Sequence, residues 1–113
     1  MEKRRVVITG MGAVTPIGNT AEDSWAAARA GKCGIGPITR YDTSSQKAKL
    51  AGEVKDFDPE ALLGKRECKR MDRFTQLALV AADQAMADSG LDREQEDLNR
   101  CGIIFSSGIG GFE

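Results

Sequence analysis

Histidine is absent from this 113-residue chain, and its absence excludes much catalytic chemistry. Histidine titrates near neutral pH and is the usual general base of acyl transfer. Without it, the chain cannot build a Ser-His-Asp triad, a Cys-His pair or a histidine-containing zinc site from its own residues. We therefore expect no self-contained acyl-transfer catalysis, and we assign no catalytic residue, no metal ligand and no cofactor site.

Cysteine is scarce as well. The three cysteines, Cys33, Cys68 and Cys101, are far apart and form no C-x-x-C pair, which favours reduced cytoplasmic thiols over a disulfide or metal site. Cys68 lies among basic residues, and neighbouring cations would favour its thiolate. Because no base or oxyanion hole is recognisable around it, we give Cys68 no catalytic role.

Long apolar runs are missing too. No stretch approaches the 18 or so apolar residues of a membrane-spanning helix, and the charged start followed by a short apolar run is typical of a strand, not of a signal peptide. The net charge of −1 and the lack of aromatic residues among the basic ones argue against nucleic acid. We expect a cytoplasmic protein with no membrane or nucleic-acid partner.

The residues that are present alternate between apolar segments and glycine turns. The β-branched run at 5–9 predicts a strand buried on both faces, and residues 101–106 predict a second strand. Residues 32–52 are rich in Gly, Ser, Thr and Pro and predict a surface excursion, at whose end residues 51–54 predict a brief strand. Strand, helices and strand, with a glycine turn after each strand, predict a layered α/β fold.

Three helices are expected between the two runs. The first begins at an Asn19-Thr20 cap and ends before Gly31, with Ala21, Trp25 and Ala28 on its apolar face. The second begins at Asp58-Pro59 and ends at Gly64. The third and longest covers residues 71–86 and is closed by Gly90; its alanine stripe suits a helix that is approached closely by its neighbours. A charged loop or irregular helical turn follows at 92–100.

The Gly10-Met11-Gly12 motif after the first run raises the possibility of dinucleotide binding. The full fingerprint would place a third glycine at position 15, but the chain has Thr15-Pro16 there, and the helix begins only after Thr20. A structural tight turn is therefore the favoured interpretation, with a nicotinamide-binding Rossmann protein as the alternative. No P-loop sequence occurs.

A basic cluster lies between residues 65 and 73, interrupted by Glu67. Its spacing predicts one side of a helix on which the positive charges act together on an acidic partner, and the alternative is a solvated helix face. The clustered cations are Lys65, Arg66, Lys69, Arg70 and Arg73.

The glycine-rich segment 106–111 follows the second run. Its glycines allow a sharp bend and the close approach of a ligand or another chain, and Ile109 is the isolated apolar side chain at that bend. The alternative is a plain turn with Ile109 in the core.

Four segments together resemble the amino-terminal part of β-ketoacyl-acyl-carrier-protein synthases of type II. They are residues 4–18 (RRVVITGMGAVTPIG), 51–57 (AGEVKDF), 70–74 (RMDRF) and 103–113 (IIFSSGIGGFE). The resemblance covers the whole chain and implies that residues 1–113 are the amino-terminal portion of a thiolase-like domain, a layered α-β-α-β-α fold that is usually a homodimer. It also implies decarboxylative condensation of an acyl-enzyme with malonyl-acyl-carrier protein in fatty acid elongation, by a cysteine and two histidines that lie beyond residue 113.

The same resemblance implies roles for particular residues. Arg66, Lys69 and Arg70 would bind the acidic acyl-carrier protein, and Ile109 would line the fatty-acyl pocket. Two other classes stay open: a noncatalytic module that binds the carrier or another subunit, and a related condensing enzyme. The related enzymes are type I synthases, polyketide ketosynthases and noncatalytic chain-length partner subunits.

Overall fold

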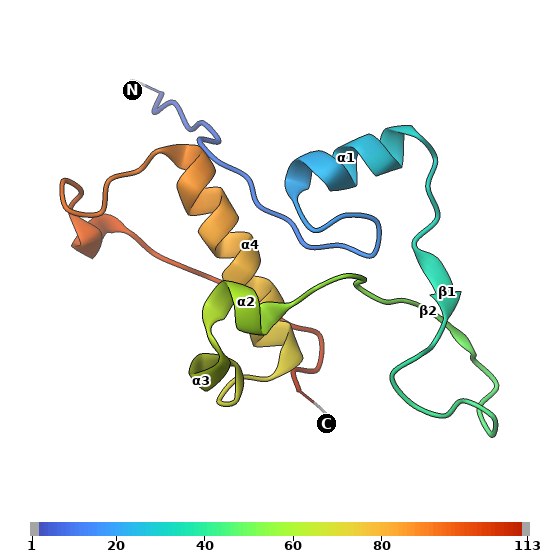
Figure 1. Ribbon diagram of the computed structural model, residues 1–113. Helices are drawn as coiled ribbons and strands as arrows, with labels where there is room; N and C mark the ends of the chain where they lie inside the picture. The colour runs from blue at the N-terminus through green and yellow to red at the C-terminus, as the bar shows by residue number, and fades with distance from the viewer. Residues whose placement is uncertain (1–2, 112–113) are drawn as a thin grey trace.

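The computed structural model describes residues 3–111 as a mixed helix-and-strand structure with extents of 59 × 37 × 28 Å. Figure 1 shows α4 near the middle, the α1 helix and the β1–β2 hairpin on one side of it, and α2 and α3 near its amino-terminal end. The elements in chain order are α1 (Ala21–Arg29), β1 (Ile35–Pro37), β2 (Leu50–Gly52), α2 (Pro59–Leu63), α3 (Lys65–Cys68), α4 (Arg73–Ser89) and a 3-10 turn, η1 (Leu98–Arg100).

The predicted starts of the first two helices are confirmed by their caps. The Thr20 hydroxyl accepts a hydrogen bond from the Asp23 backbone N–H at 3.0 Å, and the Asp58 carboxylate accepts one from the Ala61 N–H at 3.1 Å. Each bond satisfies an N–H group that has no partner within its helix. Gly31, with φ of 70°, follows α1 in the left-handed conformation that ends helices.

The long alanine-rich helix is also confirmed, as α4. It ends at Gly90, whose φ of 64° lies in the left-handed region that glycine adopts without strain. Val80 on this helix is only 6% exposed, one of the most buried side chains among residues 3–111. Helix α4 is therefore the element around which the described chain packs.

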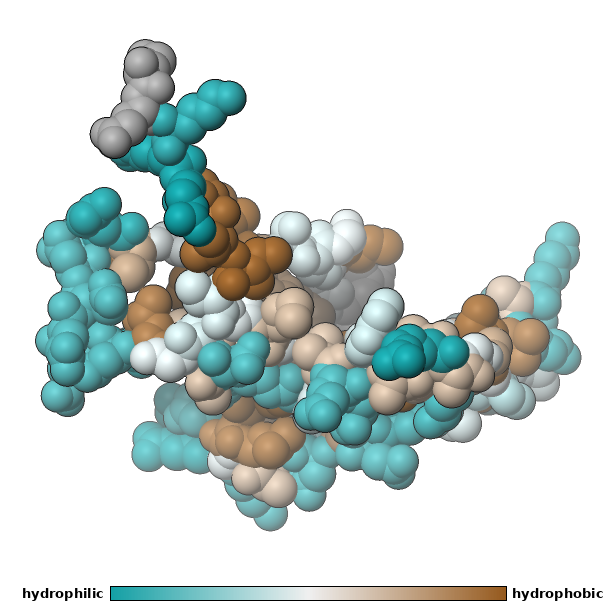
Figure 2. Space-filling view, turned by 90° about the horizontal axis from the view of Figure 1, so that it is seen from above, coloured by the Kyte–Doolittle hydropathy of each residue, from teal (hydrophilic) through white to brown (hydrophobic). Residues whose placement is uncertain are grey.

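The two predicted long strands are not formed. Residues 5–9 and 101–106 have no strand assignment, and Val6, Ile8 and Ile104 are 93, 84 and 99% exposed. Figure 2 shows apolar side chains exposed beside the hydrophilic residues near the chain start. A strand needs hydrogen bonds to a neighbouring strand, and no segment between residues 3 and 111 provides them for either run. The prediction of a strand buried on both faces is wrong for this structure.

The strand pairing that does form is a hairpin within the predicted surface excursion. Strands β1 and β2 are antiparallel, with Gly36 opposite Ala51 at the centre of the register. The hairpin extends away from α4 in Figure 1. Strand β2 covers Leu50–Gly52, so the brief strand predicted at 51–54 is confirmed with its bounds shifted toward the amino terminus.

The face of α1 that turns inward differs from the predicted one. Trp25 is 67% exposed and Ala28 is also exposed, whereas Ala21, Ser24 and Ala27 are partly covered. A hydrogen bond turns this face inward: the Ser24 hydroxyl donates to the Gly18 carbonyl at 3.1 Å and so holds that side of the helix against the preceding loop. The apolar periodicity alone did not indicate this contact.

Candidate functional site

The Gly10-Met11-Gly12 segment is extended and lies against α4. A Cβ at Gly12 would overlap the Ala81 carbonyl, and one at Gly10 would overlap the Ala85 carbonyl, so both glycines are needed for contact with the helix. The predicted tight turn is not at this motif. It comes later, where the Thr15 N–H donates to the Gly18 carbonyl at 2.8 Å.

Side chains of α4 fasten the same segment. The Met11 N–H donates to the Asp88 carboxylate at 2.9 Å, and the Ala13 N–H donates to Gln84 Oε1 at 3.1 Å. The other end of the Gln84 amide donates to the Asn19 carbonyl at 2.7 Å. One helix thus fixes both ends of the loop that leads into α1, which explains the Gly-x-Gly motif without a nucleotide.

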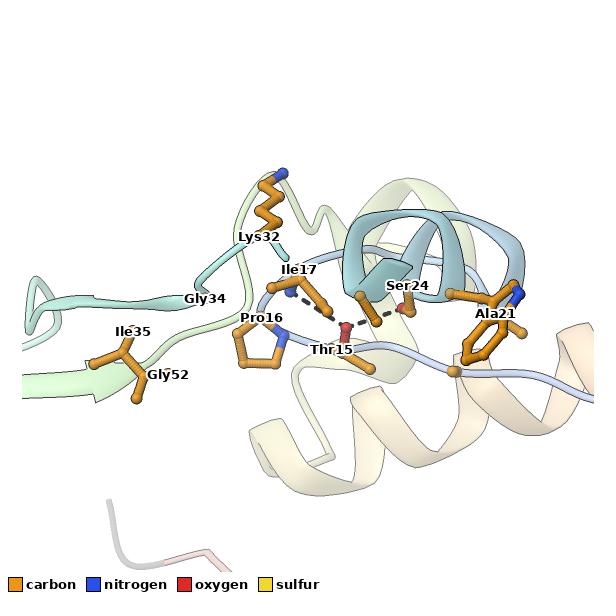
Figure 3. Close-up of a pocket in the computed structure, with 12 residues that line it drawn as sticks. Thr15, Pro16, Ile17, Ala21, Ser24, Lys32, Gly34, Ile35 and Gly52 are labelled. Carbon is orange, nitrogen blue, oxygen red and sulfur yellow. Dashed lines mark hydrogen bonds between the residues drawn. The ribbon is translucent and has the colours of Figure 1, made fainter. Parts of the chain in front are cut away.

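The loop also borders a shallow apolar hollow between α1 and the hairpin (Figure 3). The hydroxyls of Thr15 and Ser24 lie 2.9 Å apart and both are within hydrogen-bond distance of the Gly18 carbonyl, so their bonding serves the loop itself. The hollow is lined by Ala13, Thr15, Pro16, Ile17, Ala21, Ser24, Trp25, Ala28, Lys32, Gly34, Ile35 and Gly52. None of these side chains is a carboxylate, a thiol or an imidazole, so the hollow lacks an acid–base pair.

The predicted basic helix face is instead a corner between two helices. Arg66 belongs to α3, which ends at Cys68, and Lys69 and Arg70 occupy the turn that follows. The prediction of a single helix is wrong because α3 has four residues and the chain is extended again at Asp72 (ψ 159°) before α4 begins. Arg66, Lys69 and Arg70 are all exposed. We call these three residues the basic corner.

Arg73 is less exposed than the basic corner and lies against an aromatic ring. Its guanidinium carbon lies 4.8 Å from the centre of the Phe57 ring, a cation–π geometry that directs the side chain toward the segment preceding α2. Arg73 is partly buried, unlike the three residues of the basic corner. The corner therefore presents three cations; of the other two predicted ones, Arg73 is held against an aromatic ring and Lys65 is exposed at the start of α3.

Cys68 lies beneath the corner and is 8% exposed. Burial raises the pKa of its thiol above the ordinary value, and the carboxylates of Glu60, Asp58 and Glu67 raise it further. The expectation that neighbouring cations would favour the thiolate is therefore wrong. A buried thiol with a raised pKa is a poor nucleophile at neutral pH, which agrees with giving Cys68 no catalytic role.

The glycine-rich turn lies against the start of α4, close to the basic corner. The Gly110 N–H donates to the Ser107 hydroxyl at 2.9 Å, and a Cβ at Gly111 would overlap the Asp72 carboxylate. Ile109 on this turn is 80% exposed, so its interpretation as a core residue is wrong for the described structure. The sequence did not indicate the Asp72 contact, because the two residues are far apart in the chain.

Between residues 3 and 111, no helix is long and apolar enough to cross a bilayer. The same range contains no group of three or more Cys, Asp or Glu residues placed to hold a metal ion.

The glycine segment against the alanine-rich helix and the glycine turn at the start of that helix both lie within a range that a family model covers. The sequence model of the family described as "Beta-ketoacyl synthase, N-terminal domain" matches residues 3–113, and the chain belongs to that family. A solved structure, "The ishigamide ketosynthase/chain length factor", matches 82% of this chain and 23% of its own with a TM-score of 0.74 and 40% identity. The expected thiolase-like α/β class is confirmed.

Several individual relatives that share one name are similar to the chain over nearly its whole length. The chain is 48% identical over all 113 residues to "3-oxoacyl-[acyl-carrier-protein] synthase 2" of Synechocystis and 50% identical over 111 residues to the protein of that name in Coxiella burnetii. It is 49% identical over 112 residues to the Staphylococcus aureus protein of the same name. The chain spans 27% of the length of each of these relatives.

Proposed function

We propose that residues 1–113 are the amino-terminal portion of a 3-oxoacyl-acyl-carrier-protein synthase of type II. The observation that carries the proposal is the 48% identity over the whole chain with a relative of that name. The proposed reaction is the decarboxylative condensation of an acyl-enzyme with malonyl-acyl-carrier protein in fatty acid elongation. The chain has no histidine, so the two catalytic histidines would be supplied from outside these residues, and the resemblance implies the same for the cysteine nucleophile.

Within that enzyme, the basic corner is the proposed docking site for the acidic acyl-carrier protein. Arg66, Lys69 and Arg70 are exposed on one helix–turn segment, where their summed potential attracts an acidic partner over roughly a Debye length, about 10 Å at 0.1 M salt. The side chain of Cys68, in the same segment, is buried and holds the segment in place. Electrostatic complementarity of this kind raises the association rate and selects the partner.

Ile109 is proposed to line the fatty-acyl pocket. It is an exposed apolar side chain on a turn whose glycines allow close approach of another segment. An apolar side chain in that position would be covered by the acyl chain and by the rest of the enzyme.

The native protein is further proposed to be a cytoplasmic homodimer that binds neither nucleic acid nor membranes.

A polyketide ketosynthase or a noncatalytic chain-length partner is the second candidate. It is favoured by the structural similarity to a ketosynthase/chain length factor at 40% identity. A chain-length partner lacks the cysteine at the nucleophile position. Sequencing of the native polypeptide and a malonyl-dependent condensation assay therefore separate this noncatalytic partner from both kinds of catalytic synthase.

The docking proposal is tested by reversing the basic corner in the native polypeptide with Arg66→Glu, Lys69→Glu and Arg70→Glu. We expect carrier affinity to fall about tenfold or more at low salt, and the dependence of the dissociation constant on salt to become shallower. The measurement is a titration with acyl-carrier protein by calorimetry at three salt concentrations.

A second triple variant controls for net charge. It reverses three exposed cations on the hairpin loop and on the loop after α4, which changes the total charge by the same amount. Carrier affinity unchanged in the corner variant, or reduced equally in both variants, would remove the docking assignment. The control residues are Lys47, Lys49 and Arg93.

A further inference from the structure

Gln76 connects α4 to the turn that carries the basic corner. Its side-chain Nε2 donates to the Cys68 carbonyl at 3.1 Å and to the Met71 carbonyl at 3.2 Å. These two carbonyls flank Lys69 and Arg70 in the sequence. A single amide group in the first turn of α4 therefore holds both ends of the segment that presents two of the three cations.

Apart from the burial of Cys68, the other constraints on the turn are local. Helix α3 has four residues, and a helix of that length is not stable by its own hydrogen bonds. The backbone bonds of the turn are local, from the Arg70 N–H to the Glu67 carbonyl at 3.0 Å and from the Met71 N–H to the Cys68 carbonyl at 3.3 Å. Between residues 3 and 111, the Gln76 amide is the polar side-chain contact that joins this local turn to a long helix.

The position of Gln76 favours strong hydrogen bonds to the turn. It is partly buried, so its hydrogen bonds compete with water less than exposed ones do. Its carbonyl partners come from residues eight and five positions earlier, so the bonds form only when the turn folds back on α4. Loss of the donor would leave the Met71 carbonyl without its side-chain partner and would free the turn to adopt other conformations.

We propose that Gln76 is a positioning residue that fixes the basic corner in the conformation in which it binds the carrier protein. The inference rests on the proposed docking function. Gln76 itself does not contact the carrier; it acts through the backbone of residues 68–71. Preorganisation of this kind raises affinity because the turn is not ordered at the moment of binding.

The test is Gln76→Met in the native polypeptide, with Gln84→Met as the matched control. Both changes remove an amide from α4 and keep the length of the side chain, but Gln84 holds the loop of Ala13 and Asn19 instead of the basic corner. We expect carrier affinity to fall about threefold to tenfold in Gln76→Met and to stay within twofold of the wild type in Gln84→Met. Gln76→Glu, which replaces the donor with an acceptor and adds a negative charge beside the cations, should weaken carrier binding at least as much as Gln76→Met.

Two further readouts separate positioning from general destabilisation. Amide hydrogen exchange of residues 69–72 should be faster in Gln76→Met than in Gln84→Met. The salt dependence of carrier binding should keep its wild-type slope in Gln76→Met, because all three cations remain. Equal carrier affinity in the Gln76 and Gln84 variants, or unchanged exchange in the turn, would overturn the proposal.

The outcome of the triple reversal distinguishes failure of this inference from failure of the proposed function. If the reversal weakens carrier binding and the Gln76 variants do not, docking stands and the positioning role is wrong. If the reversal leaves carrier binding unchanged, the docking site lies elsewhere and the role of Gln76 in docking is overturned with it.

Discussion

Ile109 is an exposed apolar side chain on a bend that requires glycine. It is 80% exposed on a bend in which Gly110 has a φ of 85° and Gly111 touches Asp72. No branched side chain adopts that φ without strain, so the bend needs glycine on the carboxyl side of Ile109. Burial of Ile109 against an acyl chain would contribute about 1.5–3 kcal/mol.

Enlarging this side chain tests the pocket assignment. We expect Ile109→Phe in the native polypeptide to lower the condensation rate with the longest acyl substrates about tenfold and to leave short ones nearly unchanged, because the ring fills space that the acyl terminus would occupy. Ile109→Val is the control and should accept long chains as well as the wild type does. The measurement is kcat/KM over a series of acyl lengths; equal losses at every length would contradict the role.

At the scale of elements, α4 organises the described chain in two ways: its small residues allow close approach, and its Gln84 and Asp88 side chains accept hydrogen bonds. The glycine segment approaches the helix backbone at Ala81 and Ala85, while Gln84 and Asp88 bond to the N–H groups of that segment. Close approach and polar attachment reinforce each other, because the segment must lie near the helix for its N–H groups to reach the side chains. An unpaired extended segment is thereby held in place without a strand partner.

Adding one methyl group at this contact should be costly. A Cβ in Gly12→Ala would meet the Ala81 carbonyl and the Ala85 nitrogen (2.8 Å), which are helix backbone and cannot move aside as a flexible side chain can. We expect a loss of about 2 kcal/mol or more in the free energy of unfolding, measured by urea titration. The control is Gly36→Ala, where a Cβ would meet nothing within 4 Å. A cost for Gly12→Ala no larger than that of the control would show that the segment can move away from α4.

At the scale of the whole molecule, the described chain leaves two apolar segments uncovered. Val6 to Ile8 and Ile103 to Phe105 are exposed by 65 to 99%, far more than β-branched and aromatic side chains in a completed sheet. The chain spans 27% of the length of its curated relatives. Segments of this composition need neighbouring strands to supply hydrogen bonds before they can form a sheet.

The 113-residue chain on its own should have no condensing activity. It contains no histidine, its buried thiol has a raised pKa, and its two other cysteines lie at exposed positions outside the site built around α4. The measurement is malonyl-dependent release of carbon dioxide by the purified chain, with the native polypeptide as the positive control. Condensation by the purified chain above the no-protein blank would contradict this expectation.

Local signals in the sequence predicted the helices well. Thr20, Asp58 and Gly90 determine where helices begin or end, because caps act through bonds and φ angles within a few residues. The same reasoning failed for the basic cluster, where spacing predicted one helix but α3 ends at Cys68 and the chain is extended at Asp72 before α4 begins. Spacing indicates a shared face only if the helix is continuous.

The sequence by itself determined the starts of α1 and α2, the end of α4, the absence of histidine chemistry and the family. Only the tertiary structure decided what the glycines contact, which face of α1 turns inward, that Cys68 is buried near three carboxylates, and that Gln76 holds the basic corner. These contacts join residues that are distant in the chain or arise from burial, and neither is encoded in local periodicity. Strand pairing belongs to the same class, because it depends on where a neighbouring strand lies.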